Sequence, residues 1–111
     1  MRSKREFEAF INTAFSAYAN GEKAALACAG DGGTCNFDFV VLKMRYGSKE
    51  AAAILNRIGL RAYLHKRGEI HVSTPFGGQA LRRTVAIEAI CDTFRKAELP
   101  GVEAYVYYLT D

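Results

Sequence analysis

The stretch of sequence that decides the fold covers residues 60–74 and reads LRAYLHKRGEIHVST. Two runs in which apolar residues recur at every second position, 60–65 and 69–74, flank a short basic segment that ends in Gly68. Such runs around a glycine-containing loop predict a β-hairpin. Helical patterns lie on both sides of it along the chain, so this hairpin forms the middle of a larger arrangement.

The register of the hairpin depends on the length of its loop. A two-residue loop would set Leu64 opposite His71 and would mix the apolar and polar faces of the two strands. A three-residue loop, with Gly68 left-handed at a bulge, sets Leu64 opposite Ile70 and separates the faces. We therefore expect the three-residue loop, which gathers on one polar face Arg61, Tyr63, His65, Glu69, His71 and Ser73.

The elements around the hairpin predict the order β-α-β-β-α-β. A β-rich run over residues 37–45 is followed by a helix that Ser48 caps and Gly59 ends. After the hairpin, a helix is expected over about residues 79–97, and an alternating strand begins at Val102. This order is typical of an α+β, ferredoxin-like domain, in which an antiparallel sheet carries its helices on one face.

An N-terminal helical segment, residues 1–30, precedes the α+β body of residues 36–111 in what we expect to be a single domain, 1–111. Ser3 and Glu6 form a capping box, Asn20-Gly21 is expected to stop the helix, and a shorter helical piece should cover residues 22–29. The helix has an apolar stripe that either packs on the domain or joins subunits of a homo-oligomer, and this stripe includes Phe7, Phe10, Phe15 and Tyr18.

The composition is that of an ordinary globular domain. Of 111 residues, 50% are hydrophobic and 24% charged, which argues against disorder. The net charge of +3 permits an anionic ligand but is too small for a dedicated duplex-DNA binder. Cys28, Cys35 and Cys91 have no metal-binding spacing, so neither a metal nor a cofactor is expected. With no apolar leader or membrane-spanning run, we expect a cytoplasmic protein without membrane contact.

A glycine-containing segment between the hairpin and the last helix is the first candidate for a binding site. Gly77 and Gly78 allow a ligand to approach the backbone, and the helix expected to begin near Gln79 offers free N–H groups to an anion. Arg82 and Arg83 follow one turn later and suit phosphate or carboxylate. An ordinary loop before a solvated helical turn is the alternative.

A second glycine-rich segment, residues 30–38, precedes the first strand. Thr34, Asn36 and Asp38 could line a polar pocket, although a simple helix-to-strand turn would use the same residue types. Neither glycine segment matches a Walker loop or a dinucleotide fingerprint. The two segments together predict a ligand site made of Thr34, Asn36, Asp38, Phe76, Gly77, Gly78, Gln79, Arg82, Arg83 and His71.

Two other kinds of site remain open. A small hydrolase could use His65 or His71 as a base with Glu69 nearby, but histidines on an exposed strand are common. An RNA- or protein-binding module would instead use the open face of the sheet. Phe39, Tyr63 and Tyr105 could then stack on bases, although Glu69 and His71 occupy the aromatic positions of the usual third-strand motif.

Three stretches resemble phage anti-Thoeris "sponge" proteins, which sequester cyclic nucleotide immune signals without degrading them. They are residues 33–38 (GTCNFD), the helix start that runs from Gly78-Gln79 to Arg83-Thr84, and the tyrosine-rich residues 105–108. They cover 17 of the 111 residues. The resemblance implies a non-catalytic, homo-oligomeric phage counter-defence protein in the host cytoplasm. Its ligand would be a cyclic ADP-ribose isomer or a cyclic dinucleotide.

Overall fold

The computed structural model describes residues 3–29, 37–76 and 80–109. Within these residues, three helices and four strands include the predicted order β-α-β-β-α-β and confirm the α+β class. In chain order the elements are α1 (Lys4–Ala27), β1 (Phe39–Met44), α2 (Ser48–Ile58), β2 (Arg61–Lys66), β3 (Glu69–Ser73), α3 (Ala80–Ala97) and β4 (Val102–Tyr107).

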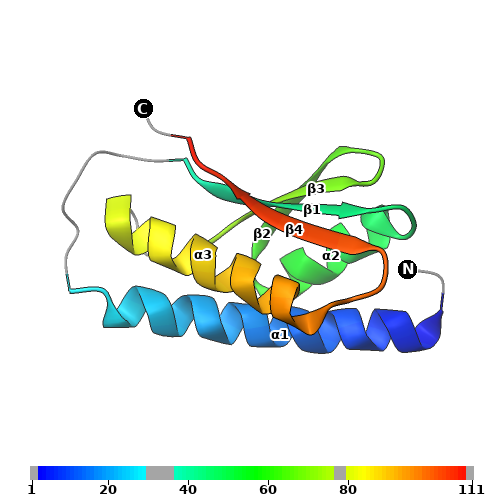
Figure 1. Cartoon of the computed structure of the whole chain (residues 1–111), viewed down its shortest axis with the longest axis horizontal. Coiled ribbons are helices and arrows are strands. Elements are labelled where there is room, and N and C mark those ends of the chain that lie inside the picture. Colours follow the sequence, from blue (N-terminus) through cyan, green and yellow to red (C-terminus); the bar gives the residue numbers. More distant parts are fainter. Residues whose placement is uncertain (1–2, 30–36, 77–79, 110–111) are drawn as a thin grey trace.

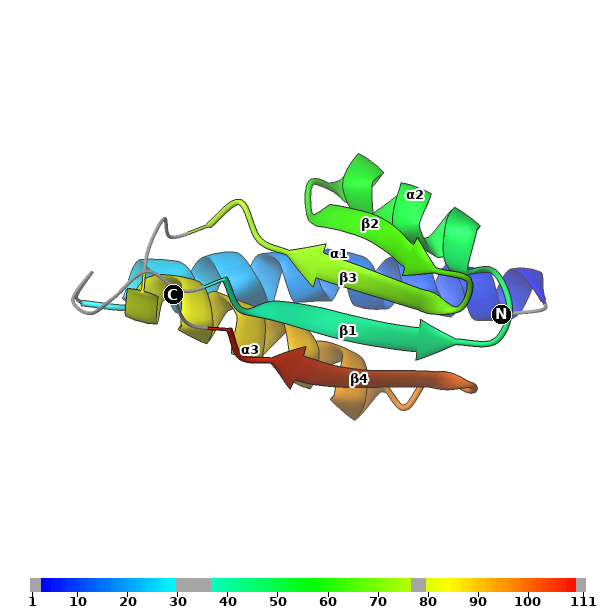
Figure 2. The ribbon, with the colours of Figure 1, turned by 90° about the horizontal axis from the view of Figure 1, so that it is seen from above.

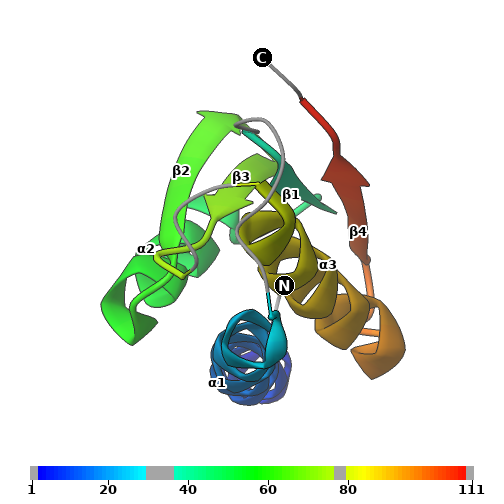
Figure 3. The same cartoon turned by 90° about the vertical axis from the view of Figure 1, so that its left-hand side faces the viewer.

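The four strands form one antiparallel sheet in the order β2-β3-β1-β4. α2 and α3 lie on one face of this sheet, and α1 packs against both helices on the side away from the strands (Figures 1 and 3). The predicted placement of the helices on one face is therefore confirmed. No helix of the described residues covers the opposite face, which Figure 2 shows from above. We call it the open face.

Alternation along β1 explains which side chains reach each face. Val40, Leu42 and Met44 point toward the helices and are buried in the core, whereas Lys43 is exposed on the open face. Val41 also belongs to the open face, since its register partners are His71 and Tyr105, yet it is only 2% exposed. Larger side chains of neighbouring strands therefore cover part of the open face.

The hairpin has the predicted register. Leu64 pairs with Ile70 and Ala62 pairs with Val72, and Gly68 has a left-handed φ of 86°. The position of the extra residue differs from the prediction, because Lys66 already pairs with Glu69. The turn thus holds two residues, and the irregularity lies in β2 between Leu64 and Lys66. A bulge of this kind keeps the apolar side chains of both strands on the core face.

α1 is one continuous helix, so the predicted stop at Asn20-Gly21 and the separate helical piece over residues 22–29 are wrong. Gly21 lies inside the helix and is buried against α3. A Cβ at Gly21 would lie 2.9 Å from Ile90 Cγ1, so the glycine allows the two helices to approach closely. The N-terminal cap is as expected, because the backbone N–H of Glu6 donates to Ser3 Oγ at 3.1 Å.

Most of the apolar stripe of α1 packs within the domain. Phe10 is fully buried and contacts Phe94 of α3, with 5.5 Å between ring centroids, and Phe7 packs at the edge of the same core. Only Phe15 of the three phenylalanines is largely exposed, at 58%. None of the helices in the described ranges has the length and apolar character needed to cross a membrane.

Ser48 does not cap α2, contrary to the prediction. The N-cap is Gly47, in a left-handed conformation with φ of 79°. Ser48 Oγ instead accepts a hydrogen bond from the backbone N–H of Gly68 at 3.1 Å, which ties the start of α2 to the hairpin turn. The helix ends at Gly59 as expected.

Candidate functional site

The predicted pocket of two glycine segments is only partly described by the structure. Thr34, Asn36, Gly77, Gly78 and Gln79 lie outside the described residues. The other predicted residues are Asp38, Phe76, Arg82, Arg83 and His71.

Asp38 joins three segments that are distant in the sequence. Its side chain is buried, and its two carboxylate oxygens accept hydrogen bonds from Thr84 Oγ1 and from the backbone N–H of Leu109, each at 2.8 Å. The carboxylate therefore fastens the start of α3 and the segment after β4 to the start of β1. These contacts belong to the framework of the fold.

The side chains of Arg82 and Arg83 also donate hydrogen bonds to other segments of the chain. Arg83 Nη2 donates to the carbonyl of Asp38 at 3.1 Å and to Ser73 Oγ at 2.8 Å. Burial lowers the pKa of Arg83, and the nearby negative charge of Asp38 opposes this shift. Arg82 Nη2 donates to the carbonyl of Cys28 at 3.3 Å, so it links α3 to the end of α1.

The structure thus brings Asp38 and Arg83 together, as predicted, but uses both to connect secondary structure elements. Phe76 packs edge-on against Tyr18 of α1, with 4.9 Å between ring centroids. The ring contacts and side-chain hydrogen bonds of His71 are with residues on the open face of the sheet. The described part of the predicted pocket is therefore divided between two places.

A row of aromatic side chains crosses the open face. In spatial order its members are Tyr107 of β4, Phe39 of β1, His71 of β3 and Tyr63 of β2. Successive ring centroids lie 5.2, 4.6 and 5.2 Å apart. We call these four residues the aromatic row.

The register of the sheet produces this row. Phe39 lies directly opposite Tyr107, and Tyr63 lies directly opposite His71, so these pairs meet across neighbouring strands. Phe39 reaches His71 diagonally, because His71 pairs with Val41 two residues further along β1. Aromatic side chains are long enough for such diagonal contacts.

The ends of the aromatic row are open to solvent. Tyr107 is 50% exposed and Tyr63 is 59% exposed, whereas His71 is at the border of burial beneath its neighbours. Tyr105 adds another exposed ring on the same face, and Lys43 Nζ lies 5.8 Å from its centroid. Large exposed aromatic surfaces on a sheet that no described helix covers are typical of an interaction surface.

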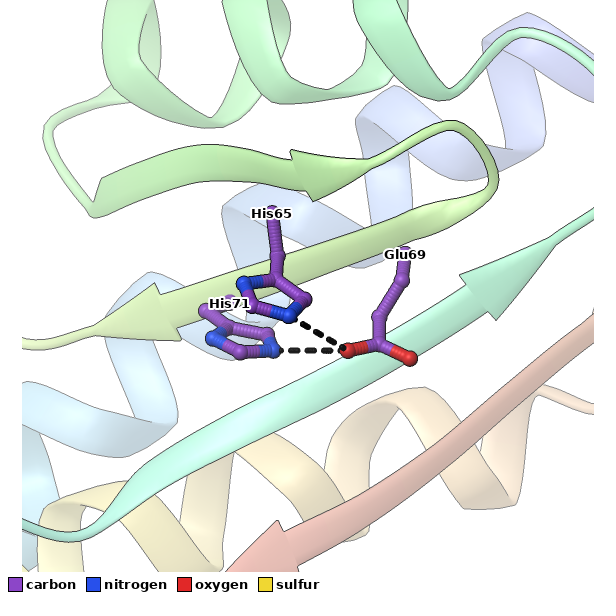
Figure 4. Close-up of side chains that lie close together, drawn as sticks. All are labelled: His65, Glu69 and His71. Atoms are coloured by element: carbon purple, nitrogen blue, oxygen red, sulfur yellow. Dashed lines mark hydrogen bonds and ion pairs between the residues drawn. The ribbon is translucent and has the colours of Figure 1, made fainter.

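A polar cluster lies beside the aromatic row, at the bulged end of β2. His71 Nε2 is 2.9 Å from Glu69 Oε2, and His65 Nε2 is 3.9 Å from the same oxygen (Figure 4). Tyr63 Oη lies 2.9 Å from His71 Nδ1 on the other side of the ring. The hydrogen bond from His71 is the largest of several contributions that lower the pKa of Glu69, and nearby Lys66 adds to it.

Basic side chains surround the open face. Lys43 and Arg61 are exposed on the face itself, and Lys66 and Arg67 are exposed at the hairpin turn. Glu69 and Glu103 supply negative charge on the same face, so charges of both signs are interspersed there. Such a surface can attract a phosphate backbone, with a moderate electrostatic contribution.

Sequence reasoning found most of the open face but not its arrangement. The alternation of the hairpin correctly placed Tyr63, His65, Glu69 and His71 together. Tyr107 was not expected to be a stacking residue, because its partner Phe39 becomes known only when β4 is paired with β1. The signal that could have found it is the alternation of residues 102–108, which puts Tyr105 and Tyr107 on one face.

Comparison of the chain with protein-family models, with curated proteins and with solved structures finds no match.

Proposed function

We propose that this protein binds nucleobases without chemical turnover, and that the open face of the sheet is the binding surface. The observation that carries this proposal is the aromatic row, with exposed tyrosines at both ends on a face without a covering helix in the described chain. Base stacking on aromatic side chains of an open sheet is a common mode of single-strand recognition.

The open face supports this function better than the predicted glycine pocket does. Tyr63, Tyr105 and Tyr107 contact His71, Lys43 and Phe39 on the same face, and each keeps between 39% and 59% of its surface exposed. Arg83 and the carboxylate of Asp38, by contrast, already make hydrogen bonds that hold the framework together. A ligand that used them would have to replace those bonds.

Unpaired bases are carried both by single-stranded RNA and by small cyclic nucleotides. The sequence left open an RNA- or protein-binding module that uses the sheet face. The resemblance to sponge proteins favours instead sequestration of a cyclic ADP-ribose isomer or a cyclic dinucleotide. Both ligands present a flat base to aromatic rings and phosphate to Lys43 and Arg61. The row spans four strands, which suits several successive bases of an extended strand.

Binding without turnover is favoured over hydrolysis. Both ring nitrogens of His71 lie within hydrogen-bond distance of a partner, Tyr63 on one side and Glu69 on the other. A histidine held in this way would have to break a bond before it could act as a general base. We accordingly propose a binding protein rather than a hydrolase. The cytoplasmic location expected from the sequence is kept as part of this proposal.

A homo-oligomer formed through α1 stays part of this proposal, with a smaller contact than the sequence suggested. Phe7 and Phe10 pack inside the domain, which leaves Phe15 as the exposed ring. Phe15 borders a shallow hollow of about 260 Å³ that is also lined by Ile11, Ile54, Arg57 and Ile58. Measurement of the native mass of wild type and Phe15→Ser tests this contact, and an unchanged mass would remove it.

The experiment that tests the binding function is fluorescence anisotropy with a labelled single-stranded RNA oligomer. Tyr107→Ala should weaken binding by about 1–3 kcal/mol, or roughly 5- to 150-fold, because one stacking ring is lost. Tyr108→Ala is the matched control. Tyr108 is equally exposed, but its hydroxyl donates to Glu88 of α3, so its loss should leave the affinity unchanged.

A second part of the experiment determines whether the protein binds the bases of RNA or those of small cyclic nucleotides. Calorimetry with a cyclic dinucleotide and with cyclic ADP-ribose measures binding of small ligands, and heating the complex should release them intact. Altered ligand would point to an enzyme instead. If neither RNA nor a cyclic nucleotide binds, or if Tyr107→Ala binds as tightly as wild type, the proposed function is wrong.

A further inference from the structure

Three side chains with metal-binding atoms meet on the open face, where β2 bulges and β3 begins. The ligand atoms of His65, Glu69 and His71 lie within 4.8 Å of one another. Figure 4 shows both imidazoles with Nε2 turned toward the same carboxylate oxygen. Two imidazoles and one carboxylate are a ligand set that Zn²⁺ takes in proteins. We propose that His65, Glu69 and His71 form a binding site for a divalent transition-metal ion of the zinc class.

Two of the three distances between the ligand atoms are close to those expected around a single ion. Tetrahedral ligands at metal distances of about 2.0–2.2 Å lie roughly 3.3 Å apart. Glu69 Oε2 is 2.9 Å from His71 Nε2 and 3.9 Å from His65 Nε2, on either side of that value. The two imidazole planes differ by only 12°, so their lone pairs run side by side, and binding requires one ring to turn. His65 has room to turn, because its side chain is 49% exposed.

Tyr63 supports the buried histidine in both states of the site. Its hydroxyl lies 2.9 Å from His71 Nδ1. A phenol can donate to Nδ1 while Nε2–H bonds to Glu69, and it can accept from Nδ1–H when Nε2 binds a metal. Histidine ligands usually have such a partner on the second nitrogen, which fixes the tautomer and the orientation of the ring.

The site is accessible and leaves a coordination position open. His71 and Glu69 have side chains only 11% and 13% exposed, so they form the floor of the site, and the side chain of His65 is 49% exposed, so the cluster reaches the solvent. Three protein ligands leave the fourth position to water or to another oxygen ligand. A phosphate oxygen of a nucleotide on the adjacent aromatic row could take that position, but metal binding itself does not depend on the proposed function.

The test is a titration of the metal-free protein with Co²⁺, followed by absorbance, and with Zn²⁺, followed by calorimetry, without any nucleotide. One ion should bind per chain, and the Co²⁺ complex should show d–d bands without a thiolate charge-transfer band. His65→Ala should weaken binding by more than about 100-fold, since even loss of a supporting second partner costs about 10- to 100-fold. Tyr63→Phe should fall within that smaller range.

Glu103→Gln is the matched control, because Glu103 is an exposed carboxylate of the same sheet face that lies opposite Lys43 in the strand register and is not part of the cluster. This variant should bind the ion like wild type. Circular dichroism verifies that His65→Ala remains folded. Absence of saturable binding at one ion per chain, a thiolate band, or wild-type affinity in His65→Ala would each overturn the proposal. Repeating the RNA measurement with a chelator tests the proposed function separately from the metal site.

Discussion

Replacement of Asp38 by alanine tests whether the buried carboxylate belongs to the framework or to a ligand site. Asp38 is 2% exposed, and its oxygens accept two hydrogen bonds of 2.8 Å, from Thr84 Oγ1 and the backbone N–H of Leu109. Each hydrogen bond to a charged group contributes about 1.5–3 kcal/mol, and its loss leaves a donor without an acceptor. We therefore expect Asp38→Ala to lower the free energy of unfolding by about 3–6 kcal/mol.

Urea denaturation followed by circular dichroism measures this loss. Thermal unfolding should show a decrease in Tm of about 12–24 °C, at about 4 °C per kcal/mol for a domain of this size. Asp38→Asn keeps the shape of the side chain and one acceptor for the N–H of Leu109, so it should lose only about 1–2 kcal/mol. Asp92→Ala is the control, because its ion pair with Lys96 is exposed and should contribute less than about 1 kcal/mol.

The reasoning is refuted if Asp38→Ala is no less stable than Asp92→Ala. If Asp38→Asn also remained fully stable but lost its affinity for a cyclic nucleotide, Asp38 would return to the ligand site that the sequence suggested. If Asp38→Ala loses much of its stability but its folded fraction binds RNA with unchanged affinity, Asp38 does not belong to the binding surface. This is the result that we expect if the aromatic row binds the bases.

Three further predictions concern the core and the surface. Gly21→Ala should lower the free energy of unfolding, because overpacking against Ile90 costs about 1–3 kcal/mol and outweighs the gain of about 1 kcal/mol in helix propensity. A higher free energy of unfolding for this variant, measured by chemical denaturation, would contradict this. The hydrogen bond to Glu88 raises the pKa of Tyr108 to about 12, so its stabilising effect is complete below the unfolded pKa of about 10 and is lost as the pH rises from 10 to 12. Ultraviolet titration of tyrosinate should lose its highest step in Tyr108→Phe, and loss of a step near the ordinary tyrosine pKa of about 10 instead would disprove the bond. Burial raises the pKa of Cys91, so alkylation followed by mass spectrometry should modify Cys91 only after unfolding, whereas modification at the rate of a small thiol would show that it is accessible.

The fold could be predicted where local chemistry and tertiary structure agree. The hairpin register followed from the need to keep Leu64 and Ile70 on the same apolar face, and no distant residue was required to decide it. Gly21 and Ser48 were misjudged because their roles depend on contacts far along the chain. The place of Gly21 inside α1 depends on its close approach to Ile90. The role of Ser48 depends on the hydrogen bond that its Oγ accepts from the backbone N–H of Gly68.

The candidate site was harder to predict for the same reason. Paired arginines after a glycine turn indicate an anion site by local rules, yet Arg83 donates to Ser73 and to the carbonyl of Asp38, which lies 45 residues earlier in the chain. The aromatic row depends on the pairing of β4 with β1, which joins Phe39 and Tyr107 across most of the chain. Only the cluster of His65, Glu69 and His71 lies within one hairpin, and its shared face was predicted correctly.

The central position of β1 has a consequence for synthesis of the protein. β1 pairs with β4 along its whole length, and residues 45–101 must be made between the two strands. At ribosomal rates of about 5–20 residues per second, that interval lasts roughly 3–11 s. During it, one edge of the apolar FVVLKM segment has no strand partner, which is the condition under which nascent chains associate with one another or recruit chaperones.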